Sequence, residues 1–115
     1  MKIQAIKYML MAQKMDRAVA FYRDVMGLTA GFTSEEWSEL AFGDAIVALH
    51  GGGDGSINPT GLSIQVEDID QACADIKAAG GTIITQPSNR PGEPIILGEF
   101  QDLEGNQVMI TQYVG

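Results

Sequence analysis

The segment DRAVAFYRDVMG, residues 16–27, returns in altered form as DQACADIKAAGG, residues 70–81. The two copies share an Asp, two Ala and the final Gly in register, at an offset of 54 residues (16 to 70). Apolar residues in both copies recur with the period of an amphipathic helix, and glycine ends each one. Self-similarity at a fixed offset indicates a fold that uses one supersecondary unit twice.

Strand-like runs surround both predicted helices in the same order. One extended run precedes each helix, at residues 3–11 and 60–66, and three short runs follow it. The following runs are 28–33, 37–42 and 45–50 in the first half, and 82–85, 95–100 and 107–113 in the second. We therefore expect an α+β fold of two βαβββ modules in one domain, with module 1 at 1–50, a glycine-rich linker at 51–59 and module 2 at 60–115.

Composition excludes several classes of protein. With 7 basic and 15 acidic side chains the net charge is −8, which repels phosphate backbones and anionic lipid, so we expect neither nucleic acid nor membrane as a partner. Lysines interrupt the apolar residues of the N-terminal segment, so it is neither a signal sequence nor a membrane span. Cys73 is the only cysteine and allows no intramolecular disulfide. We expect a cytoplasmic protein.

Three motifs in the chain belong together. They are DRAVAFYRDVMGL at 16–28, ELAFGDAIVAL at 39–49 and DLEGNQVMI at 102–110. The set resembles the vicinal-oxygen-chelate superfamily, which includes glyoxalase I, extradiol dioxygenases, fosfomycin-resistance enzymes and bleomycin-resistance proteins. Leu103 replaces the usual proline of that family's Asp-Pro-Asp-Gly-Asn turn, and Lys14 stands where an Asp commonly caps the first helix. The resemblance implies two curled sheets that form a half-barrel cup, usually completed by a second subunit.

The resemblance also implies where a metal would be held. Metal-using members take one ligand from the first and one from the last strand of each module, and these positions are here Lys7, Ala48, Gly61 and Met109. A protonated amine, a methyl group, a glycine and a thioether are not ligands for hard divalent cations. We therefore expect no metal or other cofactor, as in the metal-free bleomycin-resistance proteins.

The lining of the cup follows from strand alternation around those four positions. It combines flexible methionines with neutral polar groups, which suits an adaptable binding surface. The alternative is that the methionines only fill a packed core. We expect ligand contacts from Lys7, Met9, Trp37, Ala48, His50, Ser63, Gln65, Gln107, Met109 and Tyr113.

Several single residues leave alternatives open. Lys7 is either an active amine or a rim lysine paired with a carboxylate, and His50, the sole histidine, is either a proton shuttle or a surface residue. Trp37 either walls a pocket or covers a sheet edge. Glu99 meets Lys7 or a cationic ligand if it points inward, and water if it points outward.

Three functions are compatible with these residues. The first is a homodimeric, metal-independent protein that binds a small organic drug or metabolite, as bleomycin-resistance proteins do. The second is a lyase, isomerase or dioxygenase-like enzyme of the same superfamily, either metal-independent or with displaced ligands. The third is an accessory module that binds a partner protein. No catalytic triad or paired carboxylates can be drawn from the sequence, so the first function is favoured.

Overall fold

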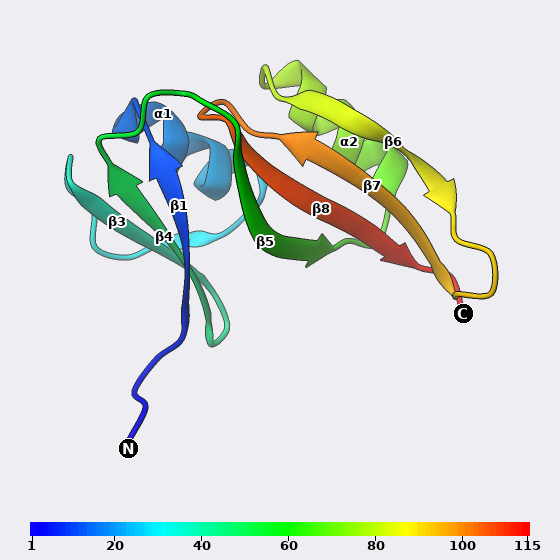
Figure 1. The fold of residues 1–115 in the computed structure, drawn as a ribbon, viewed down its shortest axis with the longest axis horizontal. Helices are drawn as coiled ribbons and strands as arrows, with labels where there is room; N and C mark the ends of the chain where they lie inside the picture. The colour runs from blue at the N-terminus through cyan, green and yellow to red at the C-terminus, as the bar shows by residue number, and fades with distance from the viewer.

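The computed structural model describes residues 1–115 as two βαβββ modules, which confirms the predicted α+β fold (Figure 1). Module 1 consists of β1 (Lys7–Ala12), α1 (Met15–Ala20), a π-helical segment η1 (Phe21–Val25), β2 (Thr29–Ala30), β3 (Trp37–Phe42) and β4 (Ala45–Gly51). Module 2 consists of β5 (Asn58–Gln65), α2 (Ile69–Ala78), β6 (Thr82–Asn89), β7 (Ile95–Gln101) and β8 (Asn106–Tyr113). None of the helices is long and apolar enough to cross a bilayer.

Each module forms one four-stranded mixed sheet, with strand orders β1-β4-β3-β2 and β5-β8-β7-β6. In both sheets the first strand pairs in parallel with the last, and the last pairs antiparallel with the third. The registers correspond: Met9, Ala48 and Glu39 lie side by side across the first sheet, and Ser63, Met109 and Glu99 lie side by side across the second. The repeat seen in the sequence therefore places corresponding residues side by side in this row of both sheets.

The first strand is shorter than the sequence predicts. It begins at Lys7 and not at Ile3, because its only strand neighbour, β4, begins at Ala45 and leaves residues 1–6 without a partner. These residues run away from the body of the chain as an extended tail (Figure 1). Ile3 and Ile6 are 68% and 70% exposed there, so the tail keeps its apolar side chains in water.

The helix predicted in the segment 16–27 is α-helical in its first half and π-helical in its second. After α1 the backbone widens into η1, where the N–H of Met26 donates to the carbonyl of Phe21 at 3.2 Å. Two consecutive aromatic side chains of this segment, Phe21 and Tyr22, are buried. Their rings meet edge to face at 5.1 Å, and Phe21 also packs against Phe100 of module 2.

The second helix follows its predicted boundaries. The Asp68 carboxylate accepts the N–H of Gln71, as expected of an N-cap, and Gly80 ends the helix with a φ of +97°. Cys73 is buried on its inner side. The helices and the covered sheet faces share one core of 17 buried apolar residues, which extends through both modules.

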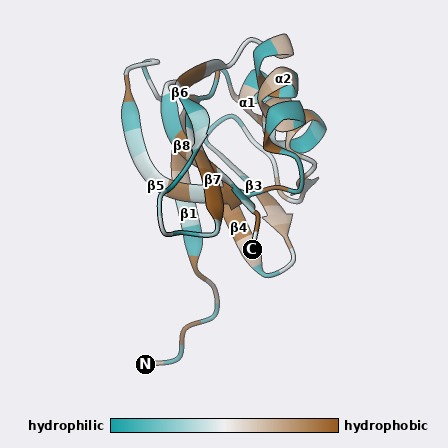
Figure 2. Cartoon of the chain, turned by 90° about the vertical axis from the view of Figure 1, so that its right-hand side faces the viewer, coloured by the Kyte–Doolittle hydropathy of each residue, from teal (hydrophilic) through white to brown (hydrophobic).

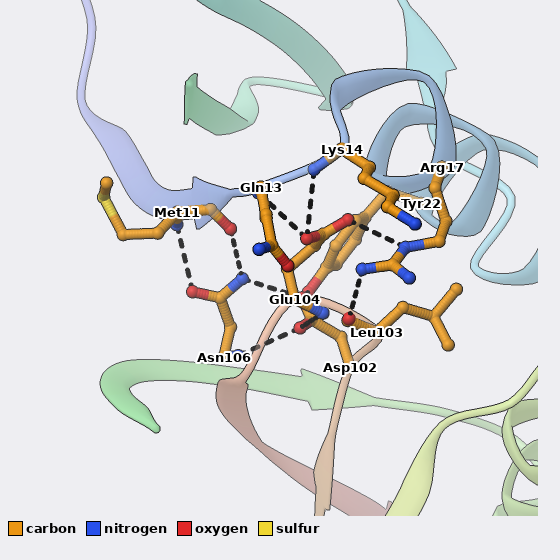
Figure 3. A network of polar contacts seen from close by, with 9 residues as sticks. All are labelled: Met11, Gln13, Lys14, Arg17, Tyr22, Asp102, Leu103, Glu104 and Asn106. Atoms are coloured by element: carbon orange, nitrogen blue, oxygen red, sulfur yellow. Dashed lines mark hydrogen bonds and ion pairs between the residues drawn. The ribbon is translucent and has the colours of Figure 1, made fainter. Parts of the chain in front are cut away.

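A polar turn at residues 102–106 joins the modules (Figure 3). Asp102 organises it: its carboxylate accepts the N–H groups of Glu104 and Asn106 and the hydroxyl of Tyr22, the last at 2.6 Å. Asn106 then reaches β1, where its side chain accepts the N–H of Met11 and donates to the Met11 carbonyl, like an added strand residue. Burial and the Asp102 carboxylate raise the pKa of Tyr22 well above its ordinary value, so Tyr22 remains a hydrogen-bond donor.

Glu104 of the same turn supplies the cap that α1 lacks. Lys14 is the N-cap residue and makes no side-chain cap, but the buried Glu104 carboxylate accepts the N–H groups of Gln13 at 2.9 Å and Lys14 at 3.3 Å. It also pairs with Arg17 at 3.1 Å, and this contact raises the pKa of the guanidinium. A carboxylate of the other module thus takes the place of the capping Asp that Lys14 replaces.

We expect Glu104→Ala to lower the free energy of unfolding by about 2–4 kcal/mol, because the backbone N–H groups of Gln13 and Lys14 and the Arg17 guanidinium lose a buried acceptor. Denaturant unfolding measures this change. Glu93→Ala serves as control, since Glu93 has only the exposed pair with Arg90. An equal effect of the two substitutions would contradict the assigned role of Glu104.

Candidate binding site

Each sheet has one face covered by helices, which lie toward the same side of the molecule, and one open face turned away from them (Figure 2). On the covered face of the first sheet Leu10, Leu40 and Leu49 are fully buried. The open face of the first sheet carries Lys7, Met9, Trp37, Glu39, Ala48 and His50. The open face of the second sheet carries Ser63, Gln65, Glu99, Gln107, Met109, Thr111 and Tyr113.

Four side chains gather on the first open face around Glu39. Its carboxylate accepts hydrogen bonds from Lys7 Nζ at 2.8 Å and from Trp37 Nε1 at 2.7 Å, both at Oε2. Lys7 Nζ also lies 5.9 Å from the centroid of the Trp37 ring. His50 meets the same ring edge to face, at 6.1 Å between centroids. Lys7, Trp37, Glu39 and His50 form the first-sheet cluster.

The contacts of the first-sheet cluster decide between the alternatives that the sequence left for Lys7 and Trp37. Lys7 is paired with a carboxylate, as in the second of its two alternatives, and Trp37 stands on the open face with its indole N–H satisfied. Sequence reasoning missed Glu39. Its signal was available, because Glu39 lies two residues after Trp37 on one strand and so shares its face.

The charges in the cluster are set by these contacts. The hydrogen bonds from Lys7 and from Trp37 lower the pKa of Glu39 below its ordinary value. His50 is exposed, and its Nδ1 lies at the carbonyl oxygen of Gly51. Nowhere in the chain do three or more His, Cys, Asp or Glu side chains gather as a metal site would require.

A hollow of about 130 Å³ opens on the second sheet. We call it the second-sheet hollow; it is lined by Pro59, Thr60, Gly61, Leu62, Glu99, Gln107 and Met109. Met109, which is 39% exposed, and Gln107 are the predicted site residues that line it. Its floor includes an irregular part of β5, where the register shifts between Pro59 and Ser63 and Gly61 has a φ of +74°.

Glu99 faces this hollow, which settles the orientation that the sequence left open. It lies opposite Met109 on the open face, and its only hydrogen-bonding partner is the hydroxyl of Thr85, at 3.4 Å. It takes part in none of the four salt bridges of the chain. Unlike Glu39, it has no cation beside it.

The other predicted contacts divide between the two open faces. Met9 is exposed on the first sheet, whereas Ala48, between Met9 and Glu39, is fully buried and offers a ligand no surface. Ser63, Gln65 and Tyr113 are exposed on the second sheet. The predicted residues thus fall into two groups of five, and β1 touches β5 at the seam between the two sheets.

An apolar groove of about 400 Å³ lies on the helix side, and two of the predicted ligand contacts, Ser63 and Gln65, line it. Eleven of its 14 lining residues are hydrophobic. Module 1 contributes Val25, Met26, Leu28, Phe42, Ala45 and Val47, and module 2 contributes residues 62–66 together with Ala72, Asp75 and Ile76. Because five consecutive residues of one segment line it, the groove follows the free backbone edge of β5.

The four positions that correspond to the ligands of metal-using family members provide no ligand set. Lys7 is committed to Glu39, Ala48 is fully buried, and Gly61 and Met109 line a hollow whose only carboxylate is Glu99. One carboxylate and a thioether do not make a ligand set for a divalent metal. The residues present therefore do not fit the metal that the fold family uses.

Solved structures of similar fold cover nearly the whole chain. A glyoxalase/bleomycin resistance protein/dioxygenase family enzyme from Burkholderia phytofirmans PsJN has a TM-score of 0.78 at 18% identity, over 93% of this chain and 96% of that one. A fosfomycin resistance protein from Listeria monocytogenes has a TM-score of 0.77 at 12% identity, over 97% and 94%. TnmS3, an antibiotic binding protein from Streptomyces sp. CB03234, has a TM-score of 0.75 at 20% identity, over 97% of both chains.

These structures show the fold alone. None of the curated proteins compared with the chain matches it. The family itself is shown by a sequence model for the Glyoxalase/Bleomycin resistance protein/Dioxygenase superfamily, which matches residues 4–110. Since that match spans most of the 115 residues, the chain belongs to the glyoxalase/bleomycin resistance protein/dioxygenase superfamily.

Proposed function

We propose that the protein binds a small organic molecule on its open faces without a metal. The observation that carries this proposal is the second-sheet hollow, where adaptable Met109 and neutral Gln107 converge beside a carboxylate and no metal ligand set exists. A protein of similar fold, TnmS3, is an antibiotic binding protein. The net charge of −8 concentrates cations near the surface and favours a cationic or neutral ligand over an anion.

We also propose that a second copy of the chain covers the apolar groove. A monomer of 12.3 kDa should expose about 6,100 Å². The chain exposes 6966 Å². The excess of about 900 Å² includes the extended tail, since residues 1–6 are all exposed, and the apolar groove adds to it.

The groove suits such an interface. It presents the unpaired edge of β5 and a largely apolar surface. A symmetric partner would cover both. Phe42 at its border is 75% exposed, and the apolar tail of residues 1–6 is free to reach another copy. The open faces, in contrast, are left for the ligand.

Ligand binding is tested by thermal shift with planar cationic drugs, glycopeptide antibiotics and neutral aromatic metabolites. A compound that binds only the folded state should stabilise it by about 2.7 kcal/mol at a hundredfold excess over Kd. We expect Met109→Trp, which fills the second-sheet hollow, and Gln107→Ala to abolish the shift. Phe32→Ala, outside the hollow, should preserve it. Equal binding by all variants would place the site elsewhere, and turnover of a ligand that Lys7→Met abolishes would replace this proposal with an enzyme.

The Glu39 contacts predict an acid transition in the fluorescence of Trp37, the only tryptophan. Because the pKa of Glu39 is lowered, the pair with Lys7 stabilises the fold above the ordinary glutamate value of 4.5 and is lost as pH falls through the folded value. The midpoint should therefore lie below 4.5. Lys7→Met should move it upward, and a midpoint that the substitution leaves unchanged would refute the pairing in solution.

The dimer is tested by sedimentation velocity at micromolar concentration, where we expect one species of twice the chain mass. Phe42→Glu should shift the protein to monomer, because it places charge in the apolar groove. Phe32→Glu, at a position that is 66% exposed but outside the groove, should not. A wild-type monomer would refute the interface.

A further inference from the structure

We propose that Glu99 binds the positively charged nitrogen of an organic cation, an ammonium or a guanidinium, in the second-sheet hollow. This inference rests on the proposed function and adds to it the chemical class of the ligand and the residue that recognises it. It is drawn from a difference between the two modules, which repeat each other in register but not in charge.

The repeat makes Glu99 the counterpart of Glu39. Each glutamate lies opposite the same position of the last strand, Ala48 in module 1 and Met109 in module 2. These positions in turn lie opposite Met9 and Ser63 of the first strands. Lys7 lies two residues before Met9 on β1, and Gly61 lies two residues before Ser63 on β5.

The two modules differ in charge at the start of their first strands. In module 1 the Lys7 ammonium lies 2.8 Å from the Glu39 carboxylate. In module 2 the strand position that matches Lys7 by register is Pro59, which pairs with Gln107, and the irregular stretch that follows it contains Gly61. Both residues line the same hollow as Glu99, and neither carries a charge. The second-sheet hollow thus contains a carboxylate on the open face with no cation from the first strand beside it.

The partners of the two carboxylates differ accordingly. Glu39 has two close donors on one oxygen, from Lys7 and Trp37. Glu99 has only a long hydrogen bond from the neutral Thr85 hydroxyl. A ligand nitrogen in the place of the missing ammonium would make a charge-assisted hydrogen bond, the stronger kind, and would be flanked by the apolar Met109.

The size of the hollow limits what enters it. Sites for whole drug-sized ligands span about 300–1,000 Å³. The hollow, at about 130 Å³, accepts the charged end of such a molecule and leaves the remainder over the open face. The ligand is therefore an amine or guanidine joined to a body that lies over the open face.

The test uses three probes of one shape: 2-phenylethylammonium, neutral 2-phenylethanol and anionic 3-phenylpropionate, titrated calorimetrically into the full chain. We expect the wild type to bind the ammonium at least tenfold more tightly than the alcohol and not to bind the anion. Glu99→Gln should lower ammonium affinity at least tenfold and leave alcohol affinity unchanged. Glu99→Asp should keep part of the preference. Glu93→Gln makes the same change in net charge far from the hollow and should match the wild type.

The outcomes separate this inference from the proposed function. Binding of the ammonium and the alcohol with equal affinity would overturn the role of Glu99 and leave a binding protein. Loss of ammonium affinity in Glu93→Gln as large as in Glu99→Gln would show a general charge effect and would also overturn it. If no probe binds any variant at millimolar concentration, while circular dichroism shows folded protein, both the inference and the proposed function fail.

Discussion

The buried Glu104 carboxylate begins a helix that lies ninety residues earlier in the chain, and the arrangement of the modules depends on it. No strand pairing joins the two sheets, so the shared apolar core and the polar turn join the modules. Asn106 contributes by pairing with the backbone of Met11 as a strand would. The start of α1 contributes as well, because the N–H groups of Gln13 and Lys14, just before it, donate to a carboxylate of module 2.

The two modules repeat the same scaffold but differ in the charges on their open faces. The fold gives each open face a glutamate at the same register, and the first strand decides what that glutamate can do. A lysine on β1 closes one site internally, whereas β5 brings no cation to the other and leaves it open. Binding capacity in such a protein is therefore set by a residue that need not touch the ligand.

The element order could be predicted from the sequence because helix period, strand alternation and glycine stops are local signals. Most strand boundaries and the shared open face of Met109, Ser63 and Gln65 follow from them. The short β1 could not be predicted, because a strand requires a neighbour and its neighbour is distant in sequence. The π-helical segment has no local signal of this kind.

The candidate site divides in the same way. Alternation around the positions implied by the family resemblance placed Lys7 and His50 on the open face. The place of Trp37 and the partner of Lys7 depend on cross-strand register, which one sequence does not reveal. Glu99 was undetermined for the same reason. The apolar groove was not predicted as a site, although Ser63 and Gln65 line it, because it forms between two modules that are distant in sequence.

The backbone at Gly61 limits which residues can stand at this position. Its φ of +74° belongs to the left-handed region, and the register of β5 shifts around it. A β-branched or bulky residue there would be strained, because a Cβ disfavours that conformation. Such a residue would have to straighten the irregular part of β5, so the shape of the second-sheet hollow depends on this glycine.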